Sequence, residues 1–168
     1  ENGDLLVYPE GDLTAPPSGR MPQGGYFFDA IIRQDPIDDE HLDPADNVQE
    51  YGPLSDEDLA WLVDSARQAR ATGRAVMASF GGTGFGDVGV IPATALQHPR
   101  GIRDITEWYI STRTRRDYIH QVFELQTRIA LANFERLHAA LGDQVDIVYI
   151  CGTDFGTQTS SFCSAETF

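Results

Sequence analysis

The chain has 168 residues, of which 41% are hydrophobic, and this combination suits one globular domain with a real core and excludes a disordered or fibrous chain. Its formal net charge of −14 argues against nonspecific binding to nucleic acid or to an anionic membrane. All 12 basic residues are arginines, which excludes a P-loop lysine, a Schiff-base lysine and a kinase strand lysine within this chain.

The first 34 residues are predicted to form two short strands around an ordered, turn-rich loop. Apolar runs at Leu5–Tyr8 and Tyr26–Ile32 flank a stretch rich in proline and glycine. Arg20 and Arg33 are the cations of this part. Either could hold a substrate carboxylate, and the alternative is a structural role in which each arginine binds a neighbouring aspartate or a loop carbonyl.

The middle of the chain is predicted to contain a helix, a strand and a glycine-rich loop in succession. Ahead of them, residues 35–57 are dense in carboxylates and lack the spacing of an EF-hand calcium site, which indicates a solvated loop. Ser55 is a good N-cap for the helix, and Gly73 is a good stop. Residues 75–80 then read as a buried strand, and the glycine loop Gly81–Gly86 follows directly.

The second half is predicted to contain two helices followed by a strand, without an internal repeat. Periodicity predicts a short helix over Ile102–Ser111, a long helix from Arg115 or Asp117 to Leu141, and a buried strand over Val145–Ile150. Two strands joined by a long helical crossover should be parallel and right-handed. The loops that follow the two strands therefore lie at one edge of the sheet, and we predict a binding site at that edge.

Polar residues follow the second strand and supply the candidate chemistry of this edge. Asp154, between Gly152 and Gly156, could accept a hydrogen bond from a ligand or act as an acid or base. The alternative is that Asp154 caps a coming helix or holds its own loop. The predicted site consists of Asp154 as the catalytic candidate and of these substrate-binding candidates: Gly81, Gly82, Thr83, Thr153, Gln158 and Arg20.

Two familiar signatures fail on their context. The glycines from Gly84 to Gly89, together with Asp154, are spaced like parts of a protein kinase, but the chain has no lysine and no His-Arg-Asp catalytic loop. A dinucleotide-binding fingerprint requires a helix that opens directly on the glycines, and residues 87–92 do not suit a helix. We therefore expect neither a kinase nor a dinucleotide-binding domain.

No metal site is predicted within the chain, because its four histidines do not form a ligand set. Cys151 and Cys163 have neither zinc-ribbon nor thioredoxin spacing, which favours free thiols in a reducing cytoplasm. These residues contain neither a signal peptide nor a long apolar span, and a missing N-terminus would hide the former. Because Ser164 is a helix N-cap candidate only four residues before Phe168, we expect a section of a longer polypeptide.

Three stretches, Cys151–Phe168, Ala78–Gly86 and Met21–Asp29, together resemble the uroporphyrinogen decarboxylase superfamily, which also contains corrinoid-dependent methyltransferases such as methylcobamide:coenzyme M methyltransferases. Residues 151–168 look like the family segment in which a strand ends at an aspartate and a Ser-Pro-Glu helix start follows, with Ala165 in place of the usual proline. Residues 78–86 are similar to the family's glycine-containing loop. Residues 21–29 resemble a stretch of its methyltransferase-like branch.

The resemblance implies a TIM-type (β/α)₈ barrel, which needs about 250 residues. Residues 1–168 would then be a partial barrel domain, with a turn-rich part over 1–54 and helix-strand units over 55–168. An unclosed barrel exposes strand edges, so we expect the chain to associate with the remainder of the barrel or with itself.

The function implied by the resemblance is corrinoid-dependent methyl transfer, with a small molecule or a corrinoid protein as substrate. A uroporphyrinogen-type decarboxylase of porphyrin biosynthesis and a noncatalytic barrel-derived binding domain remain alternatives. In the methyltransferase branch the zinc ligands would lie beyond residue 168. The resemblance therefore implies corrinoid and zinc for the full-length parent, and no cofactor or metal within this chain.

Overall fold

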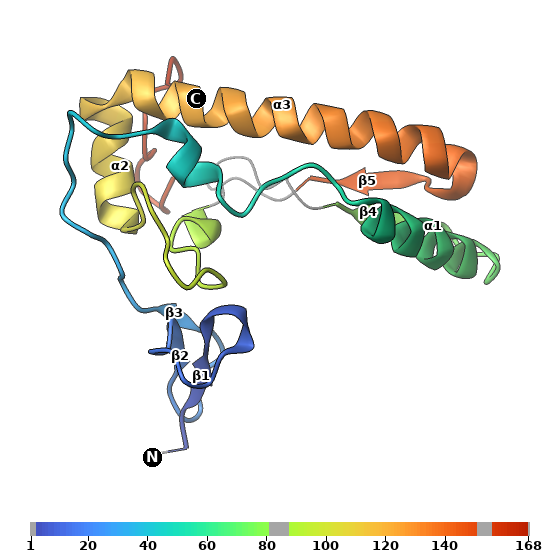
Figure 1. The fold of residues 1–168 in the computed structure, drawn as a ribbon, viewed down its shortest axis with the longest axis horizontal. Coiled ribbons are helices and arrows are strands. Elements are labelled where there is room, and N and C mark those ends of the chain that lie inside the picture. Colours follow the sequence, from blue (N-terminus) through green and yellow to red (C-terminus); the bar gives the residue numbers. More distant parts are fainter. Residues whose placement is uncertain (1–2, 81–87, 151–155, 168) are drawn as a thin grey trace. The chain divides into compact units, whose positions relative to one another are not determined.

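The computed structural model describes residues 3–80, 88–150 and 156–167. The chain divides into two units, each assembled from separate segments (Figure 1). Unit 1 comprises Glu1–Glu50, Asp87–Val122 and Asp154–Phe168, and unit 2 comprises Tyr51–Gly86 and Phe123–Thr153. The long helix α3, Arg116–Leu141, contributes residues to both units.

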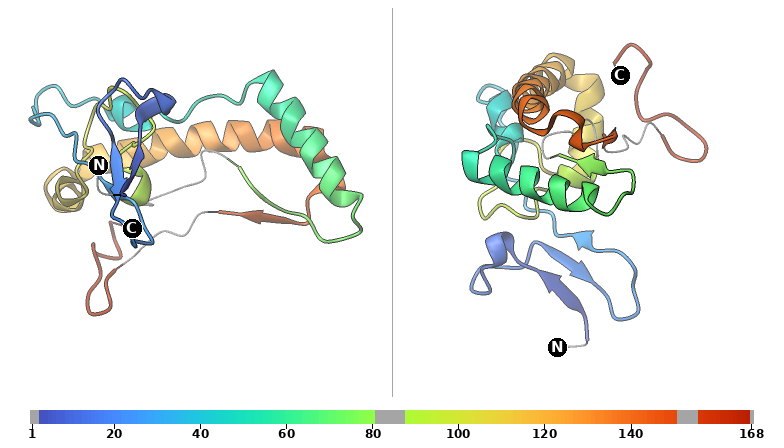
Figure 2. Two further views of the ribbon diagram at one scale, coloured as in Figure 1. Left: turned by 90° about the horizontal axis from the view of Figure 1, so that it is seen from below. Right: turned by 90° about the vertical axis from the view of Figure 1, so that its right-hand side faces the viewer.

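Unit 1 opens with a three-stranded antiparallel sheet, visible as the blue strands in Figure 2. Its strands, in spatial order, are β1 (Leu5–Val7), β2 (Gly19–Met21) and β3 (Asp29–Ala30). The two predicted strands are confirmed as β1 and β3, but the segment between them is not only a loop, because it contains β2. Its residues carry no β-branched side chain and stand between Pro17 and Pro22, so strand β2 depends on pairing with its neighbours on both sides.

The rest of unit 1 is mostly irregular. It contains the helix α2 (Ile105–Thr114) and the short 3₁₀ helices η1 (Pro9–Gly11), η2 (Pro44–Val48) and η3 (Val88–Val90). Helix α2 begins later than the predicted start at Ile102, because the side chain of Asp104 caps it by accepting from the Thr106 N–H at 2.8 Å. The preceding residues Ile102 and Arg103 are buried in the irregular segment.

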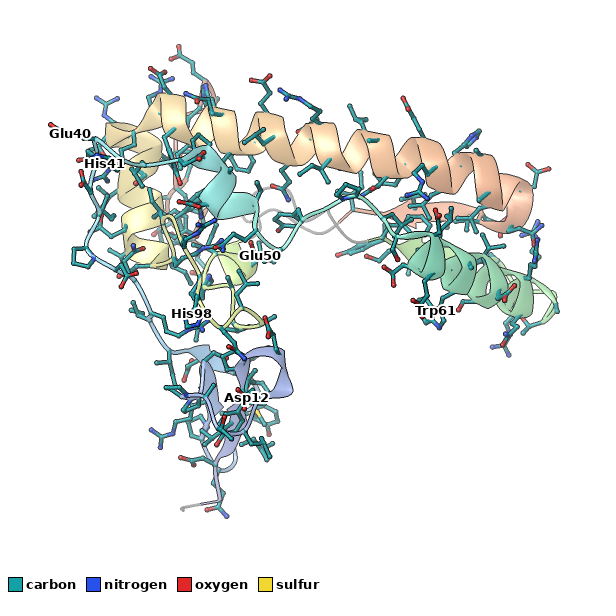
Figure 3. All side chains as sticks on the ribbon, in the orientation of Figure 1. Asp12, Glu40, His41, Glu50, Trp61 and His98 are labelled. Atoms are coloured by element: carbon teal, nitrogen blue, oxygen red, sulfur yellow. The ribbon has the colours of Figure 1, made fainter. Side chains whose placement is uncertain are left out.

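Unit 2 is built from helices and a parallel strand pair. Its elements are α1 (Asp56–Arg70), β4 (Met77–Ser79), the second part of α3, η4 (Gly142–Gln144) and β5 (Ile147–Tyr149). The predicted cap of α1 is confirmed, since the Ser55 hydroxyl accepts from the Asp58 N–H at 3.0 Å. Trp61 lies on the exposed side of this helix (Figure 3).

The predicted parallel pairing of the two strands is also confirmed. Met77 lies opposite Ile147, and Ser79 opposite Tyr149. An apolar cluster packs against Ala78 of β4, and its buried members are Ala66, Phe80, Leu137 and Leu141. In Figure 1, β5 runs in the direction opposite to α3.

The burial of the strands differs from the prediction. We expected two buried strands, but Ile147, Val148 and Tyr149 of β5 are 53%, 45% and 49% exposed. Neighbouring side chains of a strand point to opposite faces, so both faces of β5 are open. A sheet of two strands cannot cover both of its faces and both of its edges, which explains the exposure.

Candidate functional site

The carboxyl ends of β4 and β5 lie next to each other, as the sequence predicts for the binding edge. The parallel register brings Ser79 level with Tyr149, and the chain leaves the two strands through Phe80 and Ile150. Five of the predicted site residues come immediately afterwards and lie outside the residues that the structure describes. These five are Gly81, Gly82, Thr83, Thr153 and Asp154.

The opposite ends of the two strands are fixed by Asp146. Its carboxylate accepts from the Val76 N–H at 2.8 Å and from Arg70 Nη1 at 2.5 Å, while its own N–H donates to the Val76 carbonyl at 2.9 Å. The bond from the Val76 N–H, and next the bond from Arg70, hold the pKa of the Asp146 carboxyl below its ordinary value of 3.8. This arrangement sets the register that aligns the two strand ends.

The apolar cluster fixes the position of α3 along the direction of the strands. The ring of Phe80, at the end of β4, meets Phe134 of α3 edge-on, with ring centroids 6.1 Å apart. Leu141, seven residues later in the chain, belongs to the same cluster as Val145, just ahead of β5. The part of α3 that belongs to unit 2 therefore runs in the direction opposite to the strands.

Gln158 occupies the exposed tip of a tight turn in unit 1. Gly156 pairs with Ser161, and the Thr157 hydroxyl accepts from the Ser160 N–H at 3.2 Å. The turn is followed by Phe162, whose ring stacks on Tyr109 of α2 with centroids 4.3 Å apart. The backbone of this turn is thus well bonded, and the Gln158 side chain is available to solvent.

Arg20 and Arg33 are both held by other parts of unit 1. Arg20 Nη2 lies 2.5 Å from the carboxylate of Asp4, and Asp4 also accepts from the Gln23 N–H. Arg33 donates to main-chain carbonyls of the segment 92–97, at 2.5 Å to Leu96 and 2.7 Å to Ala93. These contacts agree with the structural role that the sequence analysis kept as the alternative for both arginines.

The irregular segment 91–104 is organised around Arg103, a residue that the sequence analysis missed. Its side chain is 1% exposed and forms an ion pair with Glu50, in which Nη1 lies 2.6 Å from Oε1. Arg103 also donates to the carbonyls of Asp46 and Arg100, each at 2.6 Å. The acidic stretch is therefore partly ordered, where a solvated loop was expected.

Two side-chain amides complete the support of this segment. Asn47 accepts from the Ile102 N–H at 2.7 Å and from the Tyr118 hydroxyl at 2.6 Å, and it donates to the Ile102 carbonyl at 2.7 Å. Gln34 accepts from the Arg103 and Asp104 N–H groups. Burial raises the pKa of the Tyr118 phenol, so this hydroxyl stays protonated and can donate.

Gly101 allows the close approach of Asn47. Its φ is +84°, and a Cβ placed there would lie 2.4 Å from the Asn47 side-chain oxygen. Only glycine combines an unstrained positive φ with the absence of a Cβ. Gly101 is therefore a local sequence signal that could have indicated the close approach of another segment. Arg103 gives no such signal, because its partner Glu50 lies far away along the chain.

Metal-binding and membrane-spanning features were sought in the described part of the chain. No group of three or more His, Cys, Asp or Glu residues there could hold a metal ion. None of the helices in the same ranges is both long and apolar enough to cross a bilayer. Cys163 is a free thiol. His41 pairs with Asp38 on the exposed segment that follows β3 (Figure 3).

Comparisons with family models, with curated proteins and with solved structures found no match.

Proposed function

We propose that this chain is a section of a (β/α)₈-barrel enzyme of the uroporphyrinogen decarboxylase superfamily, and that the parent protein carries out corrinoid-dependent methyl transfer. The sequence resemblance motivates the family, and one structural observation carries the barrel section. Strands β4 and β5 are parallel, are joined by a crossover that contains α2 and α3, and expose apolar side chains on both faces of β5.

The exposure of β5 supports a larger sheet. Parallel sheets are normally covered on both faces, and their strands are continuous apolar runs. The run Ile147–Ile150 has this composition, with each side chain about half exposed. Further parallel strands and their helices would cover it, and a closed barrel supplies both. We therefore propose that this chain associates with the remainder of the barrel. Where the remainder of the barrel is missing, we propose that it associates with a second copy of itself.

The proposed site lies at the carboxyl ends of β4 and β5. Asp154 would bind the substrate or transfer a proton there, and Thr153, Gln158 and the residues from Gly81 to Thr83 would line the pocket. The resemblance places the zinc ligands beyond residue 168, so we assign to this chain the binding and orientation of the substrate. We also propose a cytoplasmic location, on the cysteine usage of the sequence.

Decarboxylation of a tetrapyrrole-like acid is the second candidate function. It requires cations that hold the substrate carboxylates. The two candidates are already engaged, Arg20 by Asp4 and Arg33 by main-chain carbonyls. These contacts favour methyl transfer. A third candidate is a barrel-derived domain that binds a ligand without catalysis, which would keep the same site and lack turnover.

The full-length protein provides the test. We expect it to bind stoichiometric zinc, to bind cobalamin, and to leave added uroporphyrinogen unchanged. Asp154→Ala should abolish or strongly reduce methyl transfer from methylcobalamin to a thiol, measured by the change in the cobalamin absorption spectrum. Asp143→Ala, at an exposed position of η4, is the matched control.

Three results would contradict parts of the proposal. Conversion of uroporphyrinogen would favour the decarboxylase. Zinc and cobalamin binding without turnover would favour a binding domain. Unchanged binding and turnover in the Asp154→Ala protein would remove Asp154 from the site.

A further inference from the structure

The three-stranded sheet of unit 1 carries apolar surface that the proposed function does not use. Tyr26 and Phe27, in the connection between β2 and β3, are 91% and 84% exposed. The register of β1 and β2 brings Leu5 level with Met21, where this connection begins. Leu5, Tyr26, Phe27 and Phe28 therefore lie at one end of the sheet, which we call the aromatic end. Exposed apolar surface of this kind marks an interaction site.

The backbone that presents the aromatic side chains is folded into a tight turn. The Gly25 N–H donates to the Pro22 carbonyl at 2.8 Å, and Gly24 has a φ of +79°, which favours glycine. The Gln23 N–H donates to the Asp4 carboxylate at 2.9 Å. Because the turn is already formed, covering the aromatic side chains requires little further ordering of the backbone.

The opposite end of the sheet is attached to the segment 92–97. Ser18, directly ahead of β2, is fully buried, and its hydroxyl donates to the Thr94 carbonyl at 2.7 Å. Arg33, shortly after β3, donates to two further carbonyls of the same segment. These contacts hold the sheet in place and leave the aromatic end uncovered.

Both faces of the sheet are open. Leu5 and Leu6 are 56% and 42% exposed, and neighbouring side chains of a strand point to opposite faces. A transient docking surface needs one face, whereas a surface that is covered from both sides resembles the divided core of a permanent interface. The open faces therefore favour enclosure by the same protein over docking of a passing partner.

The charges around the aromatic end are negative. Residues 3–32 contain four carboxylates and one arginine, Arg20, which is already paired with one of them. Asp29 is exposed and follows Phe28 directly, and residues 35–40 add four more carboxylates. A complementary surface would carry cations at its rim. A second copy of this chain, with its net charge of −14, and an anionic membrane would both be repelled.

We propose that the aromatic end packs into an apolar pocket, rimmed by arginine or lysine, that another part of the parent protein supplies. The inference rests on the proposed function, because it takes the chain to be a section of a larger protein. It adds a covered surface in unit 1 to the one expected at β5 in unit 2. Tyr26 and Phe27 would be its anchors, since aromatic side chains that fill pockets supply much of the energy of an interface.

Hydroxyl-radical footprinting of the wild-type full-length protein tests whether the surface is covered. Peptide mass spectrometry gives the oxidation rate of each aromatic residue relative to the urea-unfolded protein. We expect Tyr26 and Phe27 to be protected about fourfold or more, because a folded domain of barrel size buries about three quarters of its unfolded surface. Tyr149 of β5 should be protected as well. Trp61, exposed on α1, is the control and should be protected much less.

The possible failures of this test are distinguishable. If Tyr26 and Phe27 react like Trp61 while Tyr149 is protected, the barrel section stands and the inference about the aromatic end is overturned. If Tyr149 also reacts like Trp61, the proposed section of a larger protein fails together with the inference. Protection of Tyr26 that appears only when the protein is concentrated would assign the surface to a second copy, and this result also overturns the inference.

Two opposite changes of Gln23 test the charge of the rim. Gln23 is exposed, precedes Tyr26 in the same turn, and has its N–H on the Asp4 carboxylate. Within this chain, a cation at this position is attracted to Asp4 and an anion is repelled. A cationic rim reverses the order, so the melting temperature of full-length Gln23→Glu should exceed that of Gln23→Lys by about 2 °C.

The same two changes at Gln121, an exposed position of α3, measure the effect of net charge alone. Equal melting temperatures for the two Gln23 variants, or a higher one for Gln23→Lys, would overturn the cationic rim.

Discussion

The segment 91–104 of unit 1 and the β4–β5 pair of unit 2 are held in place by different kinds of interaction. In unit 1, polar side chains of residues 33–50 bond to main-chain atoms of an irregular segment, with buried Arg103 at the centre. In unit 2, an apolar cluster packs on β4, and Asp146 bonds the starts of the two regular strands. Asn133 and Arg136 of α3 bond the segment that leads into α1. The first arrangement fixes one backbone path, because each bond requires a particular atom. The second fixes the layers and leaves much apolar surface open.

This difference bears on what each unit needs from the rest of the protein. The irregular segment finds most of its hydrogen-bond partners inside unit 1. The strands of unit 2 find their pairing partners in each other, but the apolar side chains of β5 remain about half exposed. The stability of the irregular segment of unit 1 should therefore depend on its own polar contacts. The stability of unit 2 should depend on packing against further parts of the protein or against a partner.

The largest effect is expected from Arg103→Met, which breaks the polar support of unit 1. Removing one partner of a buried ion pair leaves the other uncompensated, and the free energy of unfolding should fall by about 3 to 5 kcal/mol. Unit 1 contains buried Trp108, so urea unfolding followed by tryptophan fluorescence in a Trp61→Phe background reports on it. The exposed pair Arg128–Glu124 supplies the control Arg128→Met, which should cost at most about 1 kcal/mol.

The double variant Arg103→Met with Glu50→Leu sharpens this test. If the unpaired carboxylate causes most of the loss, removing it should restore part of the stability. A loss in the double variant as large as in Arg103→Met would show that the bonds from Arg103 to the carbonyls of Asp46 and Arg100 matter more than the ion pair.

A smaller effect is expected from Leu137→Ala, which opens a cavity in the apolar cluster of unit 2. Leu137 is 3% exposed, and its truncation should lower the free energy of unfolding by about 3 kcal/mol. Leu131→Ala on the same helix is the control, because that side chain is 59% exposed. If the two variants were equally destabilised, the cluster would not be the main support of unit 2.

The elements of unit 2 could be predicted from the sequence because their signals are local. Ser55 caps α1, and apolar residues at helical spacing mark α3. The parallel order of β4 and β5 followed from the crossover rule, which also brought the two strand ends to one edge. The exposure of β5 could not be predicted, because its apolar run indicates a covered strand whether or not the covering layer is present.

The supports of unit 1 were missed because their partners are far apart in the sequence. Asn47 bonds to Ile102 and Tyr118, and no spacing rule connects such residues. For the candidate site, topology predicted the edge. Gln126 is a further feature that the sequence could not reveal: a glutamine in a helix is ordinarily solvated, and its burial, with no acceptor for Nε2 in the described part of the chain, is known only from the packing.

The smallest predicted effect concerns the polar bonds that Asp146 makes at the starts of β4 and β5. Folding lowers the pKa of Asp146 below its ordinary value of 3.8, so its charged form stabilises the folded state. This contribution is present when the pH is above the unfolded pKa, and it is lost as the pH falls through the lower folded pKa. The urea midpoint of the wild-type protein should therefore exceed that of Asp146→Asn at about pH 6, and the difference should vanish toward about pH 2.

Asp143→Asn, in exposed η4, controls for the loss of one negative charge. A difference between wild type and Asp146→Asn that persisted at the lowest pH would assign the effect to the shape of the side chain. The charge of Asp146 would then contribute nothing to the join between β4 and β5, which would rely on packing, in contrast to the polar support of segment 91–104.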